Sequence, residues 1–169
     1  MGRASTKRNK TAYQLARENL ELSREKAAEL AQMDDSKIER IENGKTQATP
    51  WDVIALASAY KKPELCNYYC ANECPIGMKY VPEVKLKDLP QVILEMISSL
   101  NSMKKNQERL IEIGADGEIK DNELEDFIHI QEELERISLT VDSLKLWTEK
   151  MLANGNINAE QYKKLKGID

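Results

Sequence analysis

The chain has 169 residues, of which 41% are apolar and 32% charged, and its formal net charge is −4. This apolar content is ample for a packed core, so a wholly disordered chain is excluded. One Phe, two Trp, six Tyr and five Pro favour an all-α fold with charged helix surfaces over a β-sandwich. The sequence has no run of eighteen apolar residues and begins with a polar, basic segment, which predicts a cytoplasmic protein that is not membrane-bound.

Charge divides the chain into two parts. Residues 1–63 carry 12 Lys and Arg against 9 Asp and Glu, a net charge of +3, whereas residues 64–169 carry 13 against 20, a net charge of −7. Residues 1–12 hold four basic side chains and no acidic one. This composition suits a flexible arm that lies along phosphates, and it suits a solvated tail equally well. The asymmetry predicts two modules with different partners.

Residues 13–65 are expected to form a compact bundle of four to five short helices. Apolar side chains recur at helical spacing over residues 13–22. Three further helices are expected over residues 24–31, 36–42 and 50–62, where Pro is tolerated in the first turn of the last. The first two of these three follow a side chain that can cap them, namely Ser23 and then Asp34 or Asp35, and the third begins at Thr49-Pro50.

A helix-turn-helix pattern lies within this bundle. It consists of Ser23, Ala28, Met33, Ile38 and Ile41, followed by Glu42-Asn43-Gly44-Lys45-Thr46. The pattern resembles the phage-repressor family (Cro/CI, or XRE) over about 50 residues, and residues 38–46 look very like the end of its recognition helix. The resemblance implies a lambda-repressor-like DNA-binding bundle whose second motif helix enters a major groove of double-stranded DNA.

The resemblance also implies a set of DNA contacts. Arg40 would read a base edge, because its guanidinium can bond guanine O6 and N7 together. Asn43 and Lys45 would hold phosphate, which positions a protein on DNA without specifying sequence. The side chains assigned to DNA in this way are Arg24, Asp35, Ser36, Lys37, Arg40, Asn43 and Lys45.

Three residues favour a different kind of partner. The family usually has Gly between the two motif helices, at a position that often needs a positive φ, and this chain has Gln32 there. Asp34 and Asp35 place negative charge where phosphates would approach. They can serve as a helix cap and a cytosine acceptor, or they can mark a degenerate motif that binds protein. A protein-interaction adaptor is therefore the alternative to a DNA-binding regulator.

Residues 66–88 are expected to be a connector that holds all three cysteines, Cys66, Cys70 and Cys74, followed by Pro75. In one continuous helix the first and last would lie about 12 Å apart, too far to share a metal with sulfur bonds of about 2.3 Å. A zinc or iron–sulfur site therefore requires a helix break, which Pro75 permits, and a fourth ligand such as Glu73. A redox-active pair and ordinary buried small residues are the alternatives; no other cofactor is expected.

Residues 89–169 are expected to form a long, coiled-coil-like antiparallel hairpin. Its helices are expected over about 89–113 and 121–153, joined by a turn at residues 114–117, with a short final helix over 159–166. Each long helix carries an apolar series in alternating steps of three and four. The series are Leu89, Ile93, Met96, Leu100, Met103, Gln107 and Leu110, then Phe127, Ile130, Leu134, Ile137, Val141, Leu144, Thr148 and Met151.

Further apolar side chains widen this stripe beyond what one partner helix covers. A second copy of the chain is the natural cover, which predicts a homodimer built as a four-helix arrangement. A monomer whose hairpin packs on the N-terminal bundle is the alternative. This acidic half also resembles the helical tails of some repressor-type regulators of Gram-positive bacteria.

Together these features predict a repressor-like, sequence-specific transcriptional regulator that acts as a homodimer on a pseudo-palindromic site, with recognition helices about 34 Å apart. A metal- or redox-sensing variant acting through the three cysteines is a further alternative, and no particular small-molecule effector is indicated. Enzymatic activity is not expected, because the chain has one His and lacks a nucleophile–base signature. Gly44-Lys45-Thr46 matches the tail of a Walker A loop, but Glu39 stands where that loop needs Gly.

Overall fold

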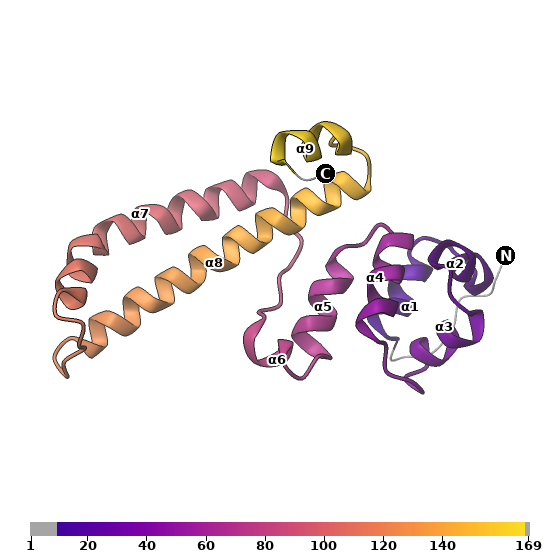
Figure 1. The fold of residues 1–169 in the computed structure, drawn as a ribbon, viewed down its shortest axis with the longest axis horizontal. Coiled ribbons are helices and arrows are strands. Elements are labelled where there is room, and N and C mark those ends of the chain that lie inside the picture. The colour runs from indigo at the N-terminus through magenta and orange to yellow at the C-terminus, as the bar shows by residue number, and fades with distance from the viewer. Residues whose placement is uncertain (1–9, 168–169) are drawn as a thin grey trace. The chain divides into compact units, whose positions relative to one another are not determined.

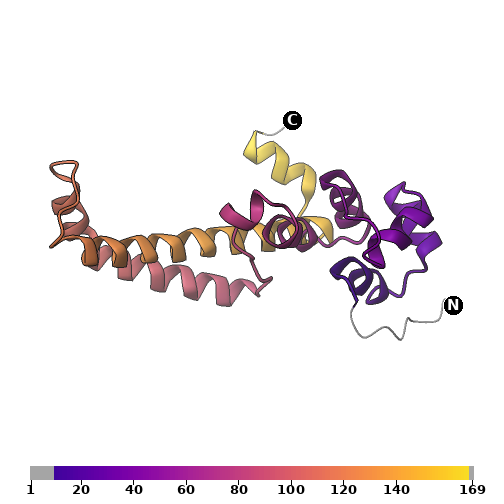
Figure 2. The ribbon, with the colours of Figure 1, turned by 90° about the horizontal axis from the view of Figure 1, so that it is seen from below.

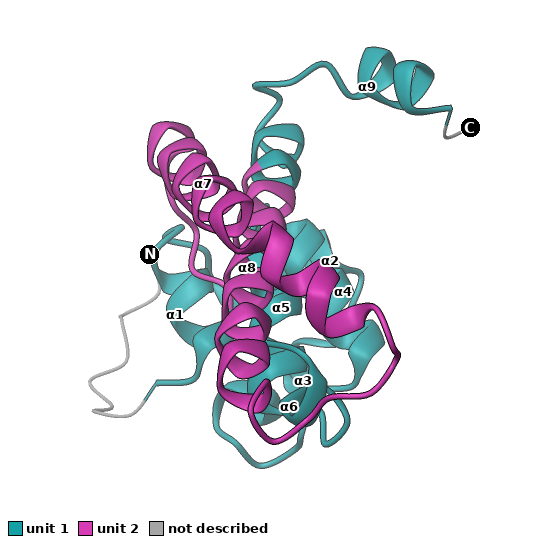
Figure 3. Cartoon of the chain, turned by 90° about the vertical axis from the view of Figure 1, so that its left-hand side faces the viewer, with its two compact units in different colours: residues 1–83, 148–169 teal, residues 84–147 magenta. Residues whose placement is uncertain are grey.

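The computed structural model describes residues 10–167, so most of the basic arm expected over residues 1–12 lies outside the described residues. The described part is all-α, as predicted, with nine helices and no strand. It comprises two compact units, distinguished by colour in Figure 3: residues 1–83 together with 148–169, and residues 84–147. The second half of the chain therefore contributes to both units.

Five short helices form the N-terminal bundle (Figure 1). The helices are α1 (Ala12–Glu18), α2 (Arg24–Ala31), α3 (Asp35–Glu42), α4 (Pro50–Ala59) and α5 (Glu64–Asn72). In each of the first four, a side-chain oxygen before the first turn accepts a backbone N–H bond that would otherwise be unmade. The caps are Ser23 and Asp34, which the sequence predicts, together with Thr11 and Thr49.

One helix is shorter than the sequence pattern predicts. The apolar spacing from Tyr13 extends to Leu22, but α1 ends at Glu18. Glu21 adopts a positive φ of 56°, and the chain turns here, so that the backbone N–H of Leu22 donates to the carbonyl of Arg17 at 3.3 Å. The turn brings Ser23 into place as the cap of α2.

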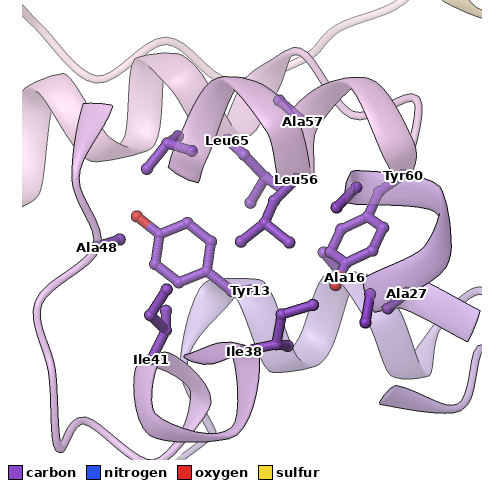
Figure 4. Close-up of a cluster of buried hydrophobic side chains, with 13 residues drawn as sticks. Tyr13, Ala16, Ala27, Ile38, Ile41, Ala48, Leu56, Ala57, Tyr60 and Leu65 are labelled. Carbon is purple, nitrogen blue, oxygen red and sulfur yellow. The ribbon is translucent and has the colours of Figure 1, made fainter. Parts of the chain in front are cut away.

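The bundle has a closed apolar core, shown in Figure 4. Tyr13 and Ala16 of α1, Ala27 of α2, Ile38 and Ile41 of α3, and Leu56, Ala57 and Tyr60 at α4 are all buried. The small residues Ala27 and Ala28 let α2 approach its neighbours closely. Because α4 turns Val53, Leu56 and Ala57 inward, Trp51 and Ile54 face solvent, with 79% and 52% of their surface exposed.

The segment expected as a connector contains the helix break that Pro75 permits, but its first residues, Cys66 and Cys70 among them, belong to α5, and a further short helix follows the break. Helix α5 ends at Asn72, before Cys74 and Pro75, and α6 spans Gly77–Tyr80. A Cβ atom at Gly77 would lie 2.1 Å from the carbonyl oxygen of Cys70, so only glycine permits this close approach of backbone to α5. The Tyr13 hydroxyl donates to Glu73 Oε2 at 3.1 Å, which ties the end of α5 to the bundle.

Two long antiparallel helices account for most of the rest of the chain (Figures 1 and 2). Helix α7 spans Leu89–Gly114, with Asp88 as its cap, and α8 spans Leu124–Ala153, beginning three residues later than expected. Arg109 Nε donates to Asp126 Oδ2 at 2.7 Å across the pair. The final helix, α9, spans Ala159–Lys166, as predicted.

Only part of each predicted apolar series is buried. Many of its members are buried or half-buried, as expected, among them Met96, Met103, Leu110, Ile130, Ile137 and Leu144. Ile93 and Leu100 on α7 and Leu134 and Val141 on α8 are instead exposed, and the residue before each of them (Val92, Ser99, Glu133 and Thr140) is buried or half-buried. A one-residue step rotates a side chain by about 100° around the helix axis, so these four predicted residues point to the flank of the hairpin.

Candidate nucleic-acid interface

The turn between α2 and α3 accommodates Gln32 in the conformation that the sequence indicates. Gln32 has φ 53° and ψ 41°, the left-handed region, and its side chain is exposed. The next backbone N–H, of Met33, donates to the carbonyl of Ala28 at 3.0 Å, which closes the end of α2. The missing glycine therefore leaves the helix-turn-helix geometry intact, with some backbone strain at Gln32.

A buried carboxylate fixes the orientation of the two motif helices. Glu42, at the end of α3, is 1% exposed and receives two bonds from Arg17, from Nε at 2.6 Å and from the second guanidinium nitrogen at 2.8 Å. Arg17 also donates to the carbonyl of Leu22 at 2.7 Å. The bond to Glu42 raises the pKa of the Arg17 guanidinium. This bidentate pair locks α1 to α3.

Arg24, one of the predicted DNA contacts, lies in the same network. Its Nε donates to Glu42 Oε2 at 3.2 Å, and its side chain is 39% exposed. Glu42 therefore holds the first residue of α2 in a defined direction while leaving part of its guanidinium open to solvent.

Lys37, a second predicted contact, is paired with Asp52 of α4. Its Nζ lies 2.5 Å from Asp52 Oδ1, and the other oxygen of Asp52 accepts the backbone N–H of Thr49 at 3.0 Å. Burial acts to raise the pKa of Asp52, but the hydrogen bonds from Lys37 and Thr49 outweigh it and hold that pKa below its ordinary value. Lys37 thus joins α3 to the capping box of α4, with its side chain 38% exposed.

The outer surface of α3 carries the other predicted side chains. Asp35, Ser36 and Arg40 are exposed. The hydroxyl of Ser36 donates to Asp34 Oδ1 at 2.7 Å, and this bond lowers the pKa of Asp34. Arg40 also acts to lower the pKa of Asp34 through its charge, but among the described residues it forms no ion pair within 4.0 Å, so its guanidinium is available to a ligand.

The loop after α3 places the last two predicted residues beside this surface. Gly44 has φ 68°, and the N–H of Lys45 donates to the carbonyl of Arg40 at 2.8 Å. The side chain of Lys45 is exposed and makes no ion pair within the described range, whereas Asn43 is half-buried. The structure therefore brings Arg40 and Lys45 together at one end of α3 as the two unpaired cations of the interface.

Sequence reasoning missed the exposed first turn of α4. Trp51 and Ile54 are apolar residues of that helix, yet both are exposed, and Trp51 is the most exposed aromatic side chain in the described bundle. The exposure of Trp51 could have been predicted from helical spacing. Val53, Leu56 and Tyr60 lie on one side of the helix, which faces the core, and residue 51 falls on the opposite side.

The cysteine segment shows no grouped ligands. Cys66, Cys70 and Cys74 are half-buried free thiols, and burial raises the pKa of Cys66. In the part of the chain that the structure describes, no three His, Cys, Asp or Glu side chains form a group that could hold a metal ion. Metal or redox sensing by these thiols therefore remains an expectation of the sequence alone.

One family model matches the N-terminal bundle. Residues 14–69, which cover most of α1 to α5, match a family model described as a helix-turn-helix domain. The match supports a DNA-binding regulator. Comparisons with curated proteins and with solved structures give no match. None of the helices within residues 10–167 combines the length and apolar character needed to cross a membrane.

Proposed function

We propose that this protein is a cytoplasmic, repressor-like transcriptional regulator of bacterial type that binds a pseudo-palindromic DNA site as a homodimer. The observation that carries the proposal is the exposed, unpaired guanidinium of Arg40 on α3 of a helix-turn-helix domain. Such a helix is suited to enter a major groove, where an Arg can read guanine through two bonds.

The surrounding side chains divide into two roles. Lys45 and the half-buried Asn43 contact phosphate, which holds α3 in register with the groove. Arg24 and Lys37 are each oriented by a carboxylate, Glu42 and Asp52, and approach the backbone with part of their charge already balanced. Asp35 and Ser36 line the leading end of α3, where a carboxylate can accept from cytosine N4.

Selection of bound sequences from a random duplex pool at two salt concentrations tests this proposal. Wild type is expected to enrich an inverted repeat with half-sites about one helical turn apart, and Arg40→Ala is expected to lose the preference at one position per half-site. Lys45→Ala is expected to weaken binding to all sequences alike and to flatten the salt dependence.

Lys26→Ala is the matched control, because Lys26 lies on α2 and is paired with Glu29 at the surface. It is expected to bind like the wild type. No enrichment by the wild type at either salt concentration would refute the regulator.

An adaptor that binds protein through the same motif is the second candidate. It is favoured by the exposed Trp51 and Ile54 and by the acidic side chains Asp34, Asp35 and Glu39, which balance much of the local positive charge. An adaptor would show a binding isotherm with a protein partner that is insensitive to salt, and its affinity would fall on Trp51→Ala while Arg40→Ala left it unchanged.

A further inference from the structure

The hairpin has a partly polar seam. On α7, the buried and half-buried positions recur in alternating steps of four and three: Val92, Met96, Ser99, Met103, Asn106, Leu110 and Ile113. On α8, the same alternation runs through Ile130, Glu133, Ile137, Thr140, Leu144 and Trp147, and Ser143 and Leu146, each one position before the last two, are buried as well. Ser99, Asn106, Glu133 and Thr140 occupy places that a two-helix core would fill with apolar side chains.

The apolar side chains missing from the seam lie one position further along each helix. Ile93, Leu100, Leu134 and Val141, each directly after a seam residue, are 37–52% exposed. Because the helices are antiparallel, a rotation of about 100° beyond the seam turns the side chains of both helices to the same side of the hairpin. Together with Ile97, Ile111 and Leu124, these residues define one surface, the outer apolar face.

The opposite side of the hairpin differs in character. Its exposed positions over the same length include Ser98, Lys105, Glu112, Glu132 and Arg136. A solvated hairpin would carry such residues on both sides. Large exposed apolar side chains are therefore concentrated on the outer apolar face, where Lys104 and Gln107 lie between them.

The apolar residues of the outer apolar face lie at the same positions along the hairpin axis in both helices. The Arg109–Asp126 pair sets the register, and counting away from it one residue at a time in each helix places Leu100 level with residue 135. Leu134 is thus next to Leu100 in height. By the same count Ile93 is level with Val141, and Ile111 with Leu124, to within one residue, so the face has three apolar levels.

We propose that a second copy of this chain covers the outer apolar face, with a two-fold axis parallel to the hairpin. Such an axis preserves height, so each level of α7 meets the same level of α8 in the other copy, and Leu100 meets the partner's Leu134. A perpendicular axis through the middle of the face would place Leu100 against the partner's Lys104 and Ile97 against the partner's Gln107. The parallel axis alone gives apolar contact at all three levels.

The size of the face is adequate for a dimer. From Ile93 to Ile111 the face is about 27 Å long, and two helices of about 10 Å diameter make it about 20 Å wide. The projected area of about 540 Å² is that of a corrugated surface, whose accessible area is larger and approaches the roughly 800 Å² per partner of a standard interface.

A two-fold axis parallel to the hairpin also agrees with the proposed function. Only the argument in this paragraph rests on that function. A height-preserving axis puts the first turns of both α7 helices at one end of the four-helix bundle, so both helix-turn-helix domains are attached at that end. A perpendicular axis would attach them at opposite ends, about 39 Å apart along a 26-residue helix. Two half-sites on one DNA face require the first arrangement.

The oligomeric state of the full chain tests the surface. By light scattering, the wild type is expected at twice the 19.3 kDa chain mass, and Leu100→Glu and Leu134→Glu are expected at the chain mass with helical circular dichroism retained. Ser98→Glu, on the opposite side of α7, is the control and stays dimeric. A monomeric wild type, or a dimeric Leu100→Glu, would overturn the proposal.

Disulfide trapping tests the axis, in chains in which Cys66, Cys70 and Cys74 are replaced by Ala. A mixture of the Leu100→Cys and Leu134→Cys chains is expected to give at least a tenfold greater yield of linked dimer than either chain alone. Linkage of Leu100→Cys with itself would establish a perpendicular axis and refute the parallel one. Neither experiment contains DNA, so a dimer that fails to select sequences would refute the regulator and leave this inference standing.

Discussion

The N-terminal bundle and the hairpin differ in which side chains they bury and which they expose. The bundle encloses Leu56, Ile38 and Tyr60 and pairs its buried charges, Arg17 with Glu42, within about 60 residues. The hairpin exposes Leu100 and Ile97 and buries Glu133. The difference shows that the core of the bundle is buried within one chain, whereas large apolar side chains of the hairpin are left exposed by the chain that carries them.

The largest loss of unfolding free energy is expected when the buried ion pair of the bundle is broken. Glu42→Ala leaves the Arg17 guanidinium buried without its partner, which costs about 3–5 kcal/mol of unfolding free energy. Urea unfolding at neutral pH measures this loss. Glu29→Ala, which breaks the exposed pair with Lys26, should cost under about 1 kcal/mol. Equal losses in the two variants would show that the bundle does not depend on its buried pair.

A paired truncation sharpens the contrast between the two regions. Leu56→Ala should lower the unfolding free energy by about 2–5 kcal/mol at every protein concentration, because Leu56 is fully buried within one chain. Leu100→Ala should lower the Tm by an amount that depends on protein concentration, as expected for a side chain buried between copies. Thermal unfolding at two concentrations a hundredfold apart separates these cases. A concentration-independent effect of Leu100→Ala would place that side chain outside any interface.

A smaller change in stability, whose dependence on pH has a defined sign, is expected from Glu73 at the end of α5. Burial raises the pKa of Glu73 above its ordinary value, although the bond from Tyr13 acts to lower it. The folded state therefore binds this proton more tightly than the unfolded state does, and the contribution of Glu73 to stability falls as the pH rises from the ordinary Glu pKa through the raised one.

Glu73→Gln keeps an acceptor for the Tyr13 hydroxyl and removes this titration. Relative to the wild type, the variant should gain stability as the pH rises above the ordinary Glu pKa, and this gain should be absent below that pKa, as measured by urea unfolding across a series of pH values. If the wild type instead became more stable than Glu73→Gln as the pH rises, the pKa of Glu73 would be lowered in the folded state and not raised.

The smallest effect is expected at the motif turn. Gln32→Gly should raise the unfolding free energy by about 0.5 kcal/mol, because relief of the left-handed strain is largely offset by the greater freedom of glycine in the unfolded chain. Glu29→Gly, three residues earlier inside α2, should lower it by about 1 kcal/mol. Thermal unfolding of the two variants in parallel checks the opposite signs.

Local features of the bundle were predictable from sequence because they depend on neighbouring residues. Ser23 and Asp34 cap helices as expected, and the positive φ at Gln32 follows from the motif. The partners of Arg24 and Lys37 were not predictable, since Glu42 and Asp52 are distant in sequence and come close only through packing.

The side of each hairpin helix that faces the other helix could not be predicted from the spacing of apolar residues alone. Apolar residues occupy two adjacent stripes on α7, one through Val92 and Met96 and one through Ile93 and Ile97, and both alternate in steps of three and four. Which stripe meets α8 depends on the side chains that α8 offers, and there Glu133 and Thr140 turn inward. Spacing identifies an apolar helix, but the choice between two stripes is made by the partner helix.

The division of the chain gives the hairpin the topology of an insertion. The first unit is formed by residues on both sides of the second, and Lys150 Nζ, in the last turns of α8, donates to the carbonyl of Lys61 at 2.8 Å across 89 positions of sequence. The entropy of closing such a segment grows only with the logarithm of its length, by about 0.6 kcal/mol per doubling. Whole heptads can therefore be added to or removed from both helices together at little cost to the first unit, so the length of this arm is free to evolve independently of the domain that carries it.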